Sequence, residues 1–113
     1  MRLLLAALAA LALAVGAPSG SEADAPSSLT PAEAYEIIAR YPWPVDTAME
    51  IAWCESRLTP SVSNGHYRGL FQLGPEYDFL LEGDVFDAAE NTRVAFLVWQ
   101  RWGETFKAWA ACL

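Results

Sequence analysis

Glu55 and Gln72 are the two side chains of this sequence whose types and spacing best suit acid catalysis. Glu55 lies in segment 51–56, IAWCES, and Gln72 ends segment 67–72, YRGLFQ. A carboxylic acid can donate a proton to a leaving oxygen, and a side-chain amide can hold a hydroxyl or acyl group beside it. Together they suit the acid-catalysed cleavage of a glycosidic bond.

The residues before Glu55 place it on the apolar face of a helix. Ala48, Ile51 and Ala52 recur at helical spacing, and the next position on the same face is Glu55. Burial disfavours the charged carboxylate, and so does the negative end of the helix dipole, so both effects raise the pKa of this acid. We therefore expect Glu55 to be protonated near neutral pH, as a general acid must be.

No second carboxylate follows this acid closely. Segment 56–75 contains no acidic residue, and Glu76 and Asp78 are the nearest ones downstream. Glycosidases that hydrolyse their substrate usually need two carboxylates. A single acid better fits an intramolecular reaction, in which Glu55 donates and then accepts a proton while the 6-hydroxyl of the substrate closes a 1,6-anhydro ring. Hydrolysis of the glycosidic bond, with Glu55 as the acid, is the alternative reaction.

Two helices should precede and carry the acid. The first begins with a capping box formed by Thr30 and Glu33, and Pro42 ends it. The second is the helix of Glu55, and its N-cap is expected at Asp46 or Thr47.

The third helix is the longest. Asp87 is expected to cap it, and Gly103 ends it just after Trp102. Trp99 and Trp102 are expected in the core. The residues between the second and third helices, from 56 to 75, should form an irregular arm with short strands and a turn at Asn64-Gly65.

Two cysteines and the N-terminal residues point to an exported protein. An apolar run over residues 3–15 and small-residue cleavage sites after Ala17 or Ala25 are typical of a secretory signal peptide. We therefore expect a signal peptide and leader over residues 1–25 and a secreted or extracytoplasmic domain over residues 26–113. In that setting Cys54 and Cys112 should form a disulfide, closing a loop of about 60 residues for roughly 4 kcal/mol of stability.

Composition and charge narrow the classes of partner. The chain has 113 residues, with 14 Asp and Glu against 7 Lys and Arg and a formal net charge of −7. An acidic surface disfavours nucleic acid and gives no help in holding an anionic membrane. One histidine and no paired-cysteine spacing argue against a metal site. We expect one domain, a monomer without metal, cofactor or membrane span in its mature form.

In order, these motifs resemble the lysozyme-like superfamily. Segment 54–56, CES, followed by segment 64–72, NGHYRGLFQ, resembles the Glu-Ser and Gly-Leu-(Met or Phe)-Gln elements of soluble lytic transglycosylases and resuscitation-promoting factors. The latter also place a Cys directly before the Glu and another near the C-terminus behind a Trp. Cys54 and segment 109–112, WAAC, match those positions. The resemblance covers about residues 46–112.

The resemblance implies a mainly α fold of the α+β lysozyme-like kind and a peptidoglycan substrate. Glu55 would be the general acid that cleaves the β-1,4 bond between N-acetylmuramic acid and N-acetylglucosamine in the glycan strands. It also implies a substrate-binding set, which comprises Gln72, Ser56, Tyr67, Gly69 and Trp109.

Each of these roles has a structural alternative. The Gln72 amide could bond a sugar or only loop backbone, and the Ser56 hydroxyl could lie near the acid or only cap its helix. Tyr67 could stack on a sugar or pack against the protein. Gly69 lets the backbone pass close to the substrate or to a helix. Trp109 is the tryptophan best placed for the cleft.

Two further points concern support for the site. Asn91 resembles a family Asn at the start of the third helix and is expected to be structural, bonding loop backbone. Many lytic transglycosylases carry an Ala-Tyr-Asn element whose Tyr supports the acid, whereas this chain has AWA at 108–110. A phenol from Tyr67 or Tyr77 is a candidate substitute. The departure also keeps a non-catalytic wall-binding module on the same fold as an alternative.

Overall fold

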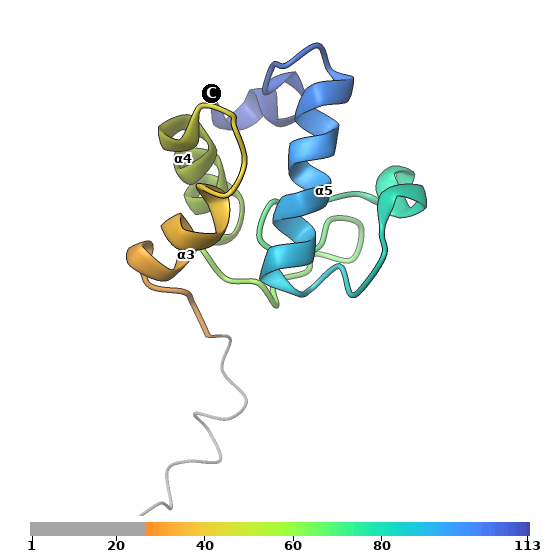
Figure 1. The fold of residues 1–113 in the computed structure, drawn as a ribbon. Helices are drawn as coiled ribbons and strands as arrows, with labels where there is room; N and C mark the ends of the chain where they lie inside the picture. The colour runs from red at the N-terminus through yellow and green to blue at the C-terminus, as the bar shows by residue number, and fades with distance from the viewer. Residues whose placement is uncertain (1–26) are drawn as a thin grey trace, which may run out of the picture.

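The structure is a computed structural model that describes residues 27–113. The expected signal peptide and leader lie outside the described residues. The elements, in chain order, are α3 (Pro31–Ile38), α4 (Val45–Ser56), the 3-10 helix η1 (Pro75–Leu80), α5 (Ala88–Arg101) and the 3-10 helix η2 (Lys107–Cys112). Figure 1 shows α3 and α4 on one side of α5, and η2 packs against both α4 and α5.

The domain is therefore mainly helical, as the sequence predicted. Within residues 27–113 the only β pairing is two isolated bridges in the arm between α4 and η1, Ser63 with Arg68 and Arg68 with Leu73. The turn between Ser63 and Arg68 is the one expected at Asn64-Gly65. In it the Asn64 side chain accepts hydrogen bonds from the amides of His66 and Tyr67. The short strands expected there are thus reduced to single bridges.

Helix α3 begins with the predicted capping box. The Thr30 hydroxyl accepts from the Glu33 amide at 3.1 Å, and the Glu33 carboxylate accepts from the Thr30 amide at 2.8 Å. The helix ends at Ile38, and the turn after it is closed by Trp43, whose indole N–H donates to the Ile38 carbonyl at 2.9 Å. The buried ring of Trp43 therefore fixes the angle between α3 and α4.

Helix α4 carries Glu55, and its start differs from the prediction. Pro44 is the N-cap, no side chain caps the helix, and Asp46 lies in the first turn, so neither Asp46 nor Thr47 is the cap. Proline fixes φ near the value the first residues need, so the helix begins earlier without a side-chain acceptor. It ends at Ser56, because Arg57 and Leu58 both adopt left-handed φ values, 55° and 60°.

Helix α5 begins and ends as predicted, but Trp102 at its end is not in the core. The Asp87 carboxylate caps it by accepting from the Glu90 amide at 2.9 Å. Trp99 is buried, whereas Trp102 is the C-cap and 47% exposed, so placing Trp102 in the core was wrong. The helix unwinds at Trp102, whose φ and ψ of −90° and 23° turn it off the buried face.

An aromatic core joins these elements. The Trp43 ring is the hub, with centroid distances of 5.6 Å to Phe71, 5.7 Å to Phe106 and 6.3 Å to Trp99. Trp43 lies in the turn after α3, Phe71 in the arm, Phe106 just before η2 and Trp99 in α5. All four side chains are buried. Packing of this kind can hold a small domain together because aromatic rings bury large areas each.

The predicted disulfide is present and links α4 to η2. Cys54 and Cys112 are bonded, with 5.9 Å between their Cα atoms and a sequence separation of 58. The bond holds the last residues of the chain against the end of α4 that carries Glu55. Among residues 27–113 no helix is long and apolar enough to cross a membrane.

Candidate active site

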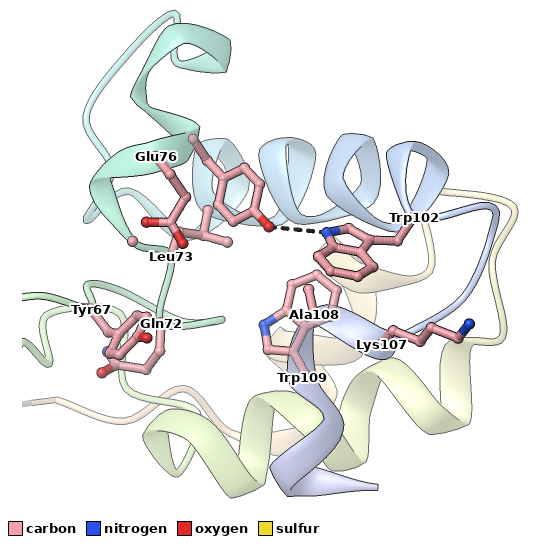
Figure 2. A pocket seen from close by; sticks show the side chains of 10 residues that line it. Tyr67, Gln72, Leu73, Glu76, Trp102, Lys107, Ala108 and Trp109 are labelled. Carbon is pink, nitrogen blue, oxygen red and sulfur yellow. Dashed lines mark hydrogen bonds between the residues drawn. The ribbon is translucent and has the colours of Figure 1, made fainter.

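Two adjoining cavities form a cleft beside the end of α4. The first, of about 250 Å³, is lined by Glu55, Tyr67, Gln72, Ala108, Trp109 and Ala111. The second, of about 200 Å³, shares Tyr67, Gln72, Ala108 and Trp109 with the first and extends toward Tyr77 and Trp102. Figure 2 shows Tyr67 and Gln72 on one side of this second cavity and Trp102, Ala108 and Trp109 on the other. The arm therefore forms one wall, and α5 and η2 form the other.

Glu55 lies half-buried in the last turn of α4 and faces the first cavity. It is the only carboxylate among the residues of the described chain that line this cavity. Burial raises its pKa above the ordinary value of 4.5, because removal from water penalises the charged form. The position and the direction of the pKa shift both agree with the expectation from the sequence.

The disulfide is the polar neighbour of this acid. The Sγ atom of Cys112 lies 3.3 Å from Glu55 Oε2. A disulfide sulfur carries no hydrogen and can only accept, so this contact is a hydrogen bond only when the protonated carboxyl donates to it. The contact therefore favours the protonated acid over the carboxylate, in the same direction as burial.

No phenol supports Glu55 in the described residues. The Tyr77 hydroxyl instead accepts from the indole N–H of Trp102 at 3.1 Å, and no hydrogen bond joins Tyr67 to Glu55. Trp109, in the place of the family's Tyr, donates its indole N–H to the Phe71 carbonyl at 2.8 Å. The expectation that Tyr67 or Tyr77 replaces the missing Tyr is thus not met, and the polar contact of Glu55 is with the Cys112 sulfur.

Gln72 lines both cavities, and within the described residues the nitrogen of its side-chain amide is hydrogen-bonded while the oxygen is not. Its Nε2 donates to the carbonyls of Val62 at 3.0 Å and Gly69 at 2.9 Å, so both amide hydrogens are used by loop backbone. Its Oε1 has no hydrogen-bond partner among residues 27–113, so it can accept from a ligand N–H or hydroxyl. The backbone of Gln72 adopts a left-handed φ of 51°, which costs a non-glycine residue about 1 kcal/mol or more.

Tyr67 and Trp109 lie on opposite walls of the cleft. Tyr67 is 43% exposed and packs edge-on against His66, with 4.5 Å between ring centroids. Trp109 is buried and lines both cavities. Tyr67 is therefore the more accessible of the two rings to a ligand, and Trp109 belongs to the packed wall of the cleft.

Ser56 and Gly69 line neither cavity, and the contacts that they make in the structure are with other parts of the protein. The buried Ser56 hydroxyl lies 2.8 Å from the Leu70 carbonyl and accepts from the Thr59 amide at 3.2 Å, so it joins α4 to the arm. Gly69 has a φ of +83°, and a Cβ there would clash with the Asn91 amide. The backbone of Gly69 was expected to pass close either to the substrate or to a helix, and in the structure it passes close to α5.

Asn91 joins α5 to the arm. This fully buried side chain accepts from the Phe71 amide at 2.8 Å and donates to the carbonyls of Val85 at 2.8 Å and Arg68 at 3.1 Å. The sequence predicted hydrogen bonds to loop backbone, and three are present. They hold the turn that presents Gln72 to the cleft.

The second cavity also has four polar or aromatic lining residues that were not predicted to bind substrate. They are Glu76, Tyr77, Trp102 and Lys107. They come from η1, the end of α5 and the start of η2, with no short motif among them, so only the fold brings them together. Within residues 27–113 no group of three or more Asp, Glu, His or Cys side chains could hold a metal ion.

Comparisons with known proteins do not add to these observations. No protein-family model matches the chain, and no curated protein or solved structure gives a significant match. The resemblance to the lysozyme-like superfamily therefore rests on the motifs of residues 46–112, and function has to be argued from the geometry of the cleft.

Proposed function

We propose that this protein is a secreted enzyme that cleaves peptidoglycan at the β-1,4 bond between N-acetylmuramic acid and N-acetylglucosamine. The observation that carries the proposal is the half-buried Glu55 carboxyl, with a raised pKa, facing a cavity that no other carboxylate lines. Such an acid can be protonated at the pH of reaction and can donate to a leaving oxygen. A disulfide in the same site is compatible with a location outside the cytoplasm.

The reaction uses one acid twice. Glu55 Oε2–H protonates the glycosidic oxygen as the bond from that oxygen to C1 breaks, and the substrate's acetamido group stabilises the positive charge at C1. The 6-hydroxyl of the same sugar then forms a new bond to C1, and the Glu55 carboxylate takes its proton. The product is a 1,6-anhydro sugar, Glu55 returns to its protonated form, and no water is consumed.

The cleft supplies the remaining requirements of this route. The free Oε1 of Gln72 can accept from an acetamido N–H or a sugar hydroxyl, which would orient the sugar beside the acid. The strained backbone of Gln72 supports a role in the site, because such strain concentrates at functional positions. The Cys112 sulfur, 3.3 Å from Glu55 Oε2, can accept a hydrogen bond from the protonated acid until a substrate oxygen replaces it.

Hydrolysis by the same site is the second candidate, and Glu76 is the observation that favours it. Glu76 lines the adjoining cavity, whereas Asp78 is held by Arg68 at 2.6 Å. Glu76 is therefore the carboxylate best placed to activate a water molecule. Such a reaction would need Glu76 as base and Glu55 as acid, and would leave reducing ends.

Mass analysis of digested peptidoglycan tests the proposal. Purified sacculi are incubated with the wild-type protein, Glu55→Gln, Glu76→Gln and the control Glu50→Gln, which changes an exposed carboxylate on the same helix. We expect muropeptides lighter by one water from the wild type, Glu76→Gln and Glu50→Gln, and none from Glu55→Gln.

Three results would contradict this expectation in different ways. Reducing ends alone, lost in Glu76→Gln, would establish hydrolysis with two carboxylates. Cleavage that survives Glu55→Gln would show that the acid is assigned wrongly. Binding to sacculi without any cleavage by the wild type would favour the non-catalytic wall-binding module.

A further inference from the structure

We infer that the cavity lined by Trp102 and Tyr77 is a second saccharide subsite, which takes an N-acetylhexosamine of the same strand as the sugar bound beside Glu55. The inference rests on the proposed function, because the ligand class is the glycan on which Glu55 acts. The two cavities share four lining residues, so a strand can pass from one to the other without leaving the cleft. Together they fall within the roughly 300–1,000 Å³ typical of ligand pockets.

Trp102 is placed as an aromatic platform and not as a core residue. It is 47% exposed and is absent from the hydrophobic core that contains Trp43, Trp99 and Trp109. One face of a β-linked N-acetylglucosamine ring carries axial C–H bonds, and these are attracted to the negative face of an aromatic ring. An exposed tryptophan bordering a cavity next to a sugar-cleaving acid therefore suits a pyranose.

One hydrogen bond positions the Trp102 ring at the edge of the cavity. Its indole N–H donates to the Tyr77 hydroxyl at 3.1 Å, as the dashed line in Figure 2 shows. This bond leaves the Tyr77 hydroxyl hydrogen free to be donated to a ligand. A ring held by a hydrogen bond loses less side-chain entropy on binding than a free one, which favours affinity.

Polar groups at the edges of this cavity match the hydroxyl and amide groups of a sugar. Glu76 and Lys107 both line it, and the shared Gln72 offers its free Oε1. Glu76 also lies 3.8 Å from His66, at the limit of an ion pair between exposed side chains, so its second oxygen can accept from a hydroxyl. The combination of one exposed ring and a few polar groups is what a saccharide subsite needs.

Trp53 is an exposed tryptophan that lies outside the cleft, so its surroundings can be compared with those of Trp102. It is 55% exposed, but the Arg57 guanidinium lies 5.1 Å from its ring centroid, and the cavity beside it has Met49 and Leu58 as neighbours. It borders neither cavity of the cleft. Trp53 therefore provides a matched control, in which an exposed indole is removed at a site with no expected sugar.

The test measures binding of chitotetraose, a β-1,4-linked tetramer of N-acetylglucosamine, by calorimetry. The protein is the full chain carrying Glu55→Gln, so that no cleavage occurs during the titration. We expect Trp102→Ala to weaken binding about tenfold, Trp102→Phe to retain most of the affinity because a ring remains, and Trp53→Ala to leave it unchanged. Thermal melting of each variant separates loss of the subsite from loss of the fold.

A second measurement does not depend on the folding of Trp102→Ala. The indole N–H signal of Trp102, assigned by its loss in Trp102→Phe, should shift in NMR spectra when chitotetraose is added, whereas that of Trp53 should not. Unchanged affinity in a folded Trp102→Ala, or no shift at saturation, overturns the subsite. If sacculi are not cleaved but chitotetraose still binds through Trp102, the subsite stands and the proposed reaction fails.

Discussion

The carboxyl of Glu55 is held where a proton is favoured over a negative charge. Burial raises its pKa, and its one hydrogen-bond partner among residues 27–113, the Cys112 sulfur, can accept a hydrogen bond but cannot donate one. A group placed in this way is useful for catalysis and unfavourable for stability once it ionises. The same property therefore makes two measurable quantities, reactivity and stability, depend on pH.

Glu55→Gln should make the protein more stable at neutral pH. Because the pKa of Glu55 is raised in the folded state, that state binds the proton more tightly than the unfolded chain. The wild type then has its full stability below the unfolded value of about 4.5 and loses part of it as the pH rises through the folded pKa. Glutamine has no charge to bury, so the gain in melting temperature should appear near pH 7 and vanish near pH 4.

Thermal unfolding followed by circular dichroism from pH 4 to pH 8 measures this difference. Glu50→Gln, a change of the same kind at an exposed position of α4, is the control. A gain that is equal at all pH values, or one that appears equally in Glu50→Gln, would mean that the position of Glu55 is not the cause.

The burial or position of a single residue could be predicted from the sequence where the neighbouring residues form a recognisable pattern. The apolar spacing around Glu55 predicted its half-buried position, and the motif around Gln72 placed it in the same cleft. Ser56 belongs to the same motif, but its hydroxyl is used to join α4 to the arm. Trp102 and Tyr77 lie 25 residues apart and meet only through the fold, so no sequence pattern marked their contact.

At the scale of the elements, helix starts were predictable where a side chain makes the cap. Thr30 and Asp87 accept hydrogen bonds from the amides three residues later, as their sequence contexts indicated. The start of α4 was misplaced because Pro44 sets it through its backbone, with no side-chain acceptor. The end of α5 was predictable as well, because Trp102 is its C-cap and Gly103 follows with a positive φ of 76°.

Asn91→Ala should detach the arm from α5. The variant leaves the Phe71 amide and the Val85 and Arg68 carbonyls without their partner, and two of the three bonds are fully buried. Unpaired buried groups cost about 1–3 kcal/mol each, so we expect a loss of about 3 kcal/mol in the free energy of unfolding. Urea titration measures this loss, and chitotetraose binding should weaken as well because Gln72 is displaced.

Thr92→Val provides the matched control for this prediction. Thr92 is the next residue of α5 and is fully buried, but its hydroxyl has no hydrogen-bond partner in the described part of the chain. Its removal should leave stability unchanged or slightly higher. Equal losses in Asn91→Ala and Thr92→Val would show that packing, and not the hydrogen bonds to the arm, determines the effect.

On the scale of the whole molecule, the disulfide between Cys54 and Cys112 has two roles, because it stabilises the fold and contacts the proposed catalytic acid. A domain of this size buries a small core, and a disulfide commonly adds what the core lacks. Here Cys54–Cys112 closes a loop across a sequence separation of 58 and also contacts the acid. The pairing itself was predictable from two cysteines and the expected signal peptide, whereas the contact with Glu55 depends on how η2 packs against α4.

The two effects of the disulfide can be separated by two double variants. Cys54→Ala with Cys112→Ala and Cys54→Ala with Cys112→Ser both remove the bond, and both should lose about 4 kcal/mol of stability by the chain-entropy estimate. They differ at the atom beside Glu55. Alanine offers the carboxyl nothing, whereas the hydroxyl introduced by Cys112→Ser can donate to the carboxylate and stabilise its charged form.

The pKa of Glu55 should therefore fall in a fixed order, highest in the wild type, lower in the alanine pair and lowest in the serine pair. NMR titration of the Glu55 side chain measures it directly, at a temperature where all three proteins are folded. In a cleavage assay the decline of activity with rising pH should begin earlier in the same order, because the acid must be protonated. If the two double variants titrate alike, a hydrogen-bonding group at position 112 does not influence the pKa of Glu55, and burial alone raises it.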